Sequence, residues 1–134
     1  MAKISDFEGI GPAFAEKLAA AGVRSVEGLL TAGASKKGRQ TLAESTGIRE
    51  AQILSWVNMA DLFRIKGVSS QFAELLNAAG IDSIKELRNR KPENLHAKMK
   101  EVNDEKSLVR QIPSGNQVAA FVEQAKALEP MITH

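Results

Sequence analysis

The residues that could carry out chemistry in this chain are few and widely separated. Cysteine is absent, and the two histidines, His96 and His134, lie far apart in the sequence. Disulfides, cysteine nucleophiles, Cys-ligated zinc and iron–sulfur clusters are therefore excluded, and no His-based metal site is indicated. The acidic residues show no paired spacing beyond that of a solvated helix face. Without a nucleophile, a general base or a metal, we expect a protein that is not an enzyme and needs no cofactor.

A glycine-rich segment at residues 33–39 superficially resembles a phosphate-binding loop. Arg39 and Gln40 stand where such a loop needs Lys followed by Ser or Thr, and no strand is predicted before it, so we reject nucleotide binding. Lys36, Lys37 and Arg39 nevertheless open a predicted helix, at the end where the helix dipole disfavours cations. We therefore take these three side chains as candidate phosphate contacts.

The chain repeats itself. Residues 8–29, moved forward by 58 positions, fall on residues 66–87 with ten of 22 positions identical, and the glycines stay in register. A weaker match relates residues 53–60 to residues 118–125 at an offset of 65, which places about seven extra residues of the second copy in the loop near residues 103–113. We expect two repeats, residues 1–58 and 59–134, with a shared core because each is short for independent folding.

Composition and the residues that begin and end helices predict an all-α fold. Hydrophobic residues make up 43% of the chain and aromatic residues only 4%, which favours helices packed through aliphatic side chains. No segment alternates with the period of a strand. Pro, Ser and Gly positions mark helix starts and stops. The expected helices cover residues 12–21, 25–32, 35–45, 49–64, 70–79, 83–90, a segment from Pro92 onward, and 115–128.

The most specific pattern lies at the turn that precedes the first helix of each repeat. We name residues 9–11 the first turn and residues 67–69 the second turn. Residues 7–18 (FEGIGPAFAEKL) place an apolar residue between two glycines before a helix, and this pattern closely resembles the helix-hairpin-helix motif. In that motif the glycines adopt backbone conformations closed to other residues, and the apolar residue, here Ile10, fills the space between two helices. Nearly the whole chain resembles a bacterial family of uncharacterised proteins with a duplicated helix-hairpin-helix domain. It is more distantly similar to the helical N-terminal domain of RecA-family recombinases.

The resemblance implies DNA binding without sequence preference, in which backbone N–H groups of the turn and the following helix contact a phosphate. It also allows a monovalent cation at a turn. DNA glycosylases with this motif place a lysine where this chain has Ala13 and Gln71, so the resemblance does not imply that activity. The residues expected to contact nucleic acid are Gly9, Ile10, Gly11, Ala13, Lys17, Lys36, Lys37, Arg39, Arg64, Lys66, Gly67 and Ser69.

Each turn has only part of what phosphate binding requires. Glu8 precedes the first turn and would repel a phosphate, whereas Arg64 and Lys66 flank the second turn favourably, but Ser69 replaces its second glycine. Lys17 follows the first turn on the next helix, where it is either a phosphate contact or a solvated surface side chain. Trp56 and its repeat equivalent Phe121 lie among aliphatic residues at helical spacing, and we expect both in the core.

The leading hypothesis is therefore a weak, non-enzymatic binder of double- or single-stranded DNA. The alternative is a protein-interaction or scaffold module that keeps the turns only for architecture, and such a module should expose an apolar patch. Net charge is only +2, and each repeat holds one more basic than acidic residue, so affinity must come from local placement of charge. No apolar run reaches about 20 residues and no signal peptide is evident, so we expect a cytoplasmic protein without a membrane partner.

Overall fold

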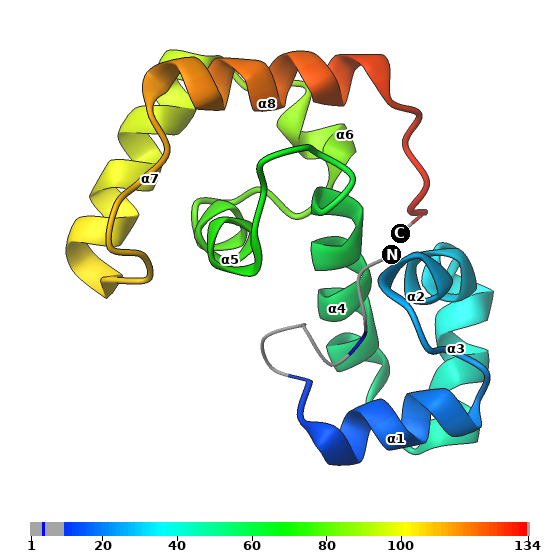
Figure 1. Ribbon diagram of the computed structural model, residues 1–134. Coiled ribbons are helices and arrows are strands. Elements are labelled where there is room, and N and C mark those ends of the chain that lie inside the picture. The colour runs from blue at the N-terminus through cyan, green and yellow to red at the C-terminus, as the bar shows by residue number, and fades with distance from the viewer. Residues whose placement is uncertain (1–3, 5–9, 134) are drawn as a thin grey trace. The chain divides into compact units, whose positions relative to one another are not determined.

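The computed structural model describes residue 4 and residues 10–133, and in these residues it contains eight α-helices and no β-strand. The all-α prediction is therefore confirmed. No helix in the described part of the chain is long and apolar enough to cross a membrane. The helices are α1 (Pro12–Ala20), α2 (Val26–Gly33), α3 (Lys36–Thr46), α4 (Glu50–Leu62), α5 (Ser70–Ala78), α6 (Ile84–Leu87), α7 (Pro92–Lys106) and α8 (Gly115–Ala127), as drawn in Figure 1.

Serine caps and glycine stops set most of these helix boundaries. The hydroxyl oxygens of Ser25, Ser35, Ser83 and Ser114 each accept the backbone N–H of the residue three positions on, which satisfies one of the donors that a helix start leaves without a partner. At the end of α3, Gly47 adopts a left-handed conformation with φ of 74°. The predicted start and stop signals therefore act as expected.

The chain divides into two compact units. Unit 1 comprises Met1–Asp61 together with Met131–His134, and unit 2 comprises Leu62–Pro130. The division between the units falls at the end of α4, and residues 131–134, after α8, belong to unit 1. The expected shared core between the repeats stays a prediction.

The order of helices recurs in the two units. Helices α1 and α5 have nine residues each and begin 58 positions apart, and α4 and α8 have thirteen residues each. The ends of α1 and α5 also match, because Val23 N–H donates to Leu18 O at 2.8 Å and Ile81 N–H donates to Leu76 O at 2.9 Å. The extra residues of the second copy lie partly in α7, which has fifteen residues against eleven in α3, and partly in the connection at residues 107–114.

Unit 1 is held together by contacts of α3 with α1 and with α2, and by aromatic packing on α4. The ring centroids of Phe14 and Trp56 lie 5.4 Å apart in an edge-on arrangement, and Trp56 is 2% exposed, as the core prediction required. Gly33 on α2 faces Val57 on α4 so closely that a Cβ at residue 33 would clash with the valine side chain. A glycine is therefore needed where these two helices meet.

Unit 2 has a corresponding aromatic pair. Phe72 and Phe121 occupy the repeat positions of Phe14 and Trp56, and their ring centroids lie 6.4 Å apart. Helix α7 packs on α5 and α8, and α6 packs on α8. The longer connection after α7 is fixed by Asn103, whose side chain donates to Val109 O at 3.0 Å and accepts Val109 N–H at 2.9 Å.

Candidate nucleic-acid interface

The first turn leads into α1 with an open helix start. Gly9 and Glu8 lie outside the described residues. Ile10 is 5% exposed and fills the interior of unit 1 as expected, whereas Gly11, the residue that caps α1, is exposed. No side-chain oxygen accepts a hydrogen bond from the first turn of α1 at this cap.

The backbone of Gly11 does not require glycine, which corrects the expectation drawn from the motif. Its φ of −78° and ψ of 173° are those of ordinary extended chain, and a Cβ at this position would meet no atom within 4 Å. The missing side chain therefore serves neither conformation nor packing in the described structure. Among the described residues, its effect is to leave the start of α1 uncovered.

Two backbone donors of α1 lie at this uncovered start. Pro12 has no N–H, and Ala15 N–H already donates to Gly11 O at 3.0 Å. The N–H groups of Ala13 and Phe14 are therefore the first-turn donors that have no acceptor within the helix. Together with the positive end of the helix dipole, they are suited to an anion.

Lys17 lies in the last turn of α1. Its ammonium nitrogen is 5.9 Å from the ring centroid of Phe14, the residue that supplies one of the two donors. Long side chains on a helix lean toward its N-terminus, and the cation–π contact with Phe14 favours that direction. The structure thus places Gly11 and Ala13 at the start of α1 and Lys17 in its last turn, with the Lys17 ammonium beside the Phe14 ring.

The second turn differs, because the side chain of its last residue satisfies one of the corresponding donors. Ser69 caps α5, and its hydroxyl accepts Phe72 N–H at 3.3 Å. Gly67 has φ of 93°, and a Cβ there would lie 3.1 Å from the ring of Phe121, so both conformation and packing require glycine. Val68 is 8% exposed and occupies the interior position that Ile10 has in unit 1.

The basic residues before the second turn are engaged within unit 2. Arg64 donates to Glu129 O at 2.9 Å. The side chain of Gln124 accepts the backbone N–H of Lys66 at 2.9 Å and donates to the backbone carbonyl of Lys66 at 3.2 Å. Lys66 is nevertheless exposed. The backbone at the second turn is therefore bonded to side chains of its own unit at Lys66 and Phe72, whereas no such bond is found at the first turn among the described residues.

The predicted cluster at the start of α3 is split by burial. Lys36 and Lys37 are exposed, but Arg39 is 2% exposed. The guanidinium of Arg39 donates to three carbonyl oxygens, those of Gly33 at 2.9 Å, Ala34 at 3.2 Å and Thr133 at 2.7 Å. The expectation that Arg39 lies on the surface beside the two lysines is therefore corrected, because its side chain is bound in the interior of unit 1.

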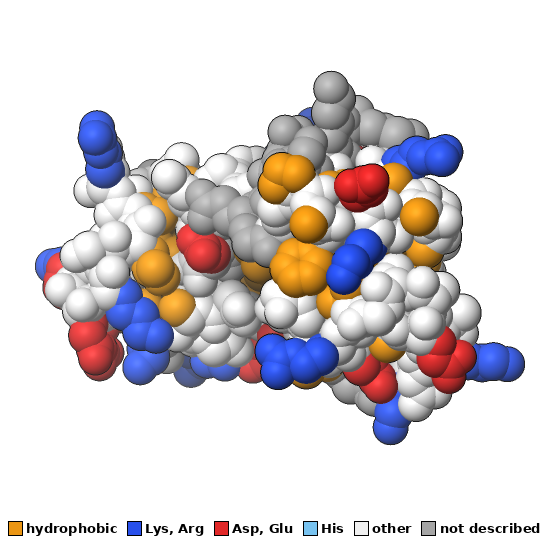
Figure 2. Space-filling view, turned by 90° about the horizontal axis from the view of Figure 1, so that it is seen from below, with side chains coloured by type: hydrophobic (Ala, Val, Ile, Leu, Met, Phe, Trp, Pro, Cys, Tyr) orange, Lys and Arg blue, Asp and Glu red, His pale blue; other side chains and the backbone are white. Residues whose placement is uncertain are grey.

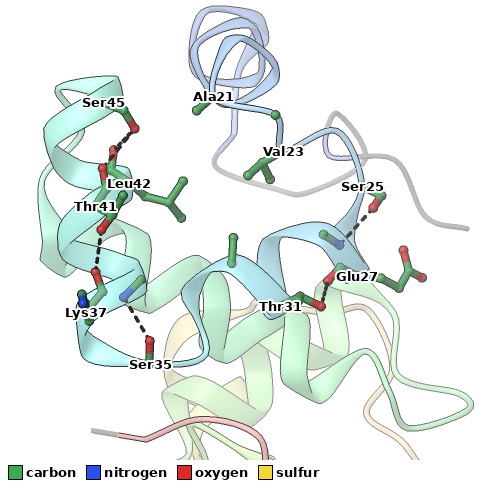
Figure 3. Close-up of a pocket in the computed structure, with 14 residues that line it drawn as sticks. Ala21, Val23, Ser25, Glu27, Thr31, Ser35, Lys37, Thr41, Leu42 and Ser45 are labelled. Atoms are coloured by element: carbon green, nitrogen blue, oxygen red, sulfur yellow. Dashed lines mark hydrogen bonds between the residues drawn. The ribbon is translucent and has the colours of Figure 1, made fainter.

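A groove of about 850 Å³ lies between α2 and α3, below the end of α1 (Figure 3). Its charged lining residues are Glu27 and Lys37, and most of the remainder are small or carry a hydroxyl. Thr31 and Thr41 donate to backbone carbonyls one turn earlier in their helices, at 2.9 Å and 3.0 Å. These two hydroxyls are therefore bonded within their own helices.

No group of three His, Cys, Asp or Glu side chains that could hold a metal is found among the described residues. No sequence pattern predicted which carbonyl oxygens accept hydrogen bonds from Arg39. Thr133 lies 94 positions away from Arg39, in an irregular segment whose residues show no helical spacing or motif.

These features define an all-helical protein of two units with recurring helix order. The chain belongs to the DUF4332 family, described as a domain of unknown function, whose model matches residues 8–128. No curated protein and no solved structure shows significant similarity to the chain.

Proposed function

We propose that this protein is a non-enzymatic, cofactor-free cytoplasmic binder of nucleic acid, weak and without sequence preference, that contacts the phosphate backbone through the start of α1 and the exposed lysines of unit 1. We interpret the two units as duplicated helix-hairpin-helix repeats, distantly similar to the N-terminal domain of RecA-family recombinases. The matching helix order and the matching Gly22 and Gly80, with φ of 89° and 97°, support this interpretation.

The observation that carries the proposal is the open start of α1. Gly11 leaves it uncovered, Ala13 and Phe14 supply backbone donors, and the ammonium of Lys17 lies over Phe14. A helix dipole together with N–H groups that have no acceptor in the helix is suited to one phosphate, and Lys17 supplies a cation on the same helix. It carries no base-specific donor pattern, so sequence-independent binding follows.

Exposed Lys36 and Lys37 add charge at the start of α3, a helix that packs against α1. On the face drawn in Figure 2, basic and acidic side chains are interspersed rather than segregated. Since only a few exposed cations of unit 1 take part in the proposed contact, we expect an affinity that is low at physiological salt.

The alternative of a scaffold or protein-interaction module predicts an apolar surface patch. Among the described residues, Met131 is the one large hydrophobic residue on the surface, with 38% exposure. The hydrophobic areas on the face drawn in Figure 2 are scattered. This distribution supports nucleic-acid binding over the alternative.

Fluorescence anisotropy with labelled duplex and single-stranded DNA, in a salt series from about 50 to 200 mM, tests the proposal. We expect binding at low salt that weakens linearly on a log–log plot, with a slope of about −0.9 for each phosphate contact on duplex DNA. Absence of binding to both DNA forms at the lowest salt would overturn the proposal.

Gly11→Asp locates the contact. A carboxylate at this cap position accepts the N–H groups of the first turn and repels phosphate, while Asp is a favourable cap that preserves α1. The matched control is Gly115→Asp, because Gly115 is also exposed at a helix start with open space for a Cβ, but α8 is already capped by Ser114. We expect the first change to weaken binding clearly more than the second.

Removing both lysines with Lys36→Ala and Lys37→Ala tests the contribution of α3. We expect weaker binding and a shallower salt slope, by up to about 0.9 for each lost contact. Lys91→Ala with Lys100→Ala removes the same charge from exposed positions of unit 2. Equal losses in the two double variants would show that only net charge matters and that α3 has no specific part.

A further inference from the structure

The segment that follows α8 binds in unit 1 through its backbone. We name residues 131–133 the returning segment. Thr133 N–H donates to Ala34 O at 2.8 Å, and Thr133 O accepts the guanidinium of Arg39 at 2.7 Å. Ile132 is 7% exposed, whereas its neighbour Met131 is exposed. The segment is thus held at the α2–α3 corner by one buried side chain and by two backbone hydrogen bonds.

Among the described residues, Arg39 is a buried cation without an acidic partner. The ion pairs among the described residues join Arg90 to Glu86, Lys98 to Glu101 and Lys126 to Glu123, and none of them includes Arg39. Its three acceptors are neutral carbonyls, two of them in its own corner. Buried charges are normally paired, so this arrangement is a costly way to hold a cation.

The two nitrogens of the guanidinium have different partners. Nη1 donates to Gly33 O and Ala34 O, within the corner between α2 and α3. Nη2 donates only to Thr133 O of the returning segment among the described atoms. If the segment leaves, Nη1 stays anchored and Nη2 loses its acceptor. Arg39 is also three positions from Lys36 on α3, a spacing that makes side chains neighbours on a helix surface.

We propose that the returning segment is an autoinhibitory contact that withholds Arg39 from a phosphate-binding cluster with Lys36 and Lys37. This inference rests on the proposed nucleic-acid binding. Release of the segment uncovers Nη2 beside the two exposed lysines and adds one phosphate contact. A phosphate oxygen is an anionic acceptor and bonds a guanidinium more strongly than the neutral carbonyl of Thr133 does. Nucleic acid and the segment therefore compete for the same donor.

Ile132→Asn tests the inference in the full chain, since it removes the buried anchor of the segment without adding charge. The matched control is Met131→Asn, the same polar change at the exposed neighbouring position. Hydrogen exchange at the Thr133 amide, which donates to Ala34 O, reports release independently of DNA. We expect faster exchange in the first variant and exchange like the wild type in the second.

Anisotropy titrations then measure the consequence for binding. We expect Ile132→Asn to bind duplex DNA severalfold more tightly than the wild type, with a salt slope steeper by about 0.9, and Met131→Asn to match the wild type. Adding Arg39→Gln should remove the gain. Circular dichroism of each variant confirms retained helix content.

The possible failures are distinguishable. If the wild type binds and the released variant binds no tighter, or gains affinity also with Arg39→Gln, the autoinhibition is refuted and the proposed function stands. If neither the wild type nor the released variant binds at low salt, both proposals are refuted. If only the released variant binds, with a gain that needs Arg39, both are supported.

Discussion

At the scale of single residues, the difference between the two turns comes down to the pair Gly11 and Ser69. Both cap a nine-residue helix with nearly the same backbone angles, φ of −78° and −84° with ψ of 173°. Only Ser69 has an oxygen that accepts a first-turn N–H, and it does so from Phe72. The two caps therefore differ in the availability of helix donors rather than in backbone angles.

Exchanging these two residues is a direct test of that difference. Gly11→Ser should supply the missing acceptor, stabilise α1 and weaken DNA binding, because the added hydroxyl competes with phosphate for the helix donors. Ser69→Gly should leave Phe72 N–H open and not weaken binding. Anisotropy and thermal melts of both variants check this, and a loss of affinity from Ser69→Gly equal to that from Gly11→Ser would contradict it.

Gly33 shows how one residue can set the distance between two helices. Gly33→Ala places a methyl group against Val57, and overpacking of this kind costs about 1–3 kcal/mol of unfolding free energy. When Val57→Ala is also present, Gly33→Ala should lower the free energy of unfolding by less than it does alone. The effects of the two changes on denaturant unfolding should therefore not be additive. The control is Gly115→Ala, at a position with nothing within 4 Å of the added Cβ, where we expect little change. Full additivity would argue against the contact.

At the scale of elements, the connection between α7 and α8 depends on one side chain. Asn103→Ala should cost about 1–3 kcal/mol, because it leaves both backbone groups of partly buried Val109 without their partner. Asn94→Ala, an exposed position on the same helix, is the matched change and should have little effect on the melting temperature. Similar losses in both variants would contradict the role assigned to Asn103.

Helix boundaries were largely predictable from local signals, and the exceptions have local causes. Pro12, Ser35 and Gly47 mark a start or a stop in the sequence and do so in the structure. The helix expected over residues 83–90 ends instead at Leu87. Arg90 N–H donates to Leu87 O in a tighter turn, and Pro92 disfavours helical backbone at the residue before it.

The candidate site was less predictable, because burial depends on contacts between distant parts of the chain. Lys36, Lys37 and Arg39 look alike in the sequence, yet only Arg39 is buried, and one of its acceptors lies at Thr133. The motif pattern likewise did not distinguish a glycine needed for conformation, as at Gly67, from one that leaves a helix start open, as at Gly11.

At the scale of the whole molecule, a net charge of +2 and mixed surface charge limit the kind of nucleic-acid binding that is physically reasonable. Contacts with phosphates alone give affinity without base discrimination. Two duplexes of equal length and base composition but shuffled sequence should therefore bind with equal affinity at every salt concentration. A reproducible preference between them in anisotropy titrations would contradict backbone-only recognition.

The edge-on packing of Phe14 against Trp56 also gives the protein an internal spectroscopic reporter. Trp56 is the chain's single tryptophan, tyrosine is absent, and Trp56 lies in unit 1. Tryptophan emission during denaturant unfolding therefore follows unit 1 alone, whereas far-ultraviolet circular dichroism follows the helices of both units. If the two units fold as one cooperative body, the two signals must trace one coincident transition. Separate midpoints would show that each repeat of this duplicated chain unfolds on its own.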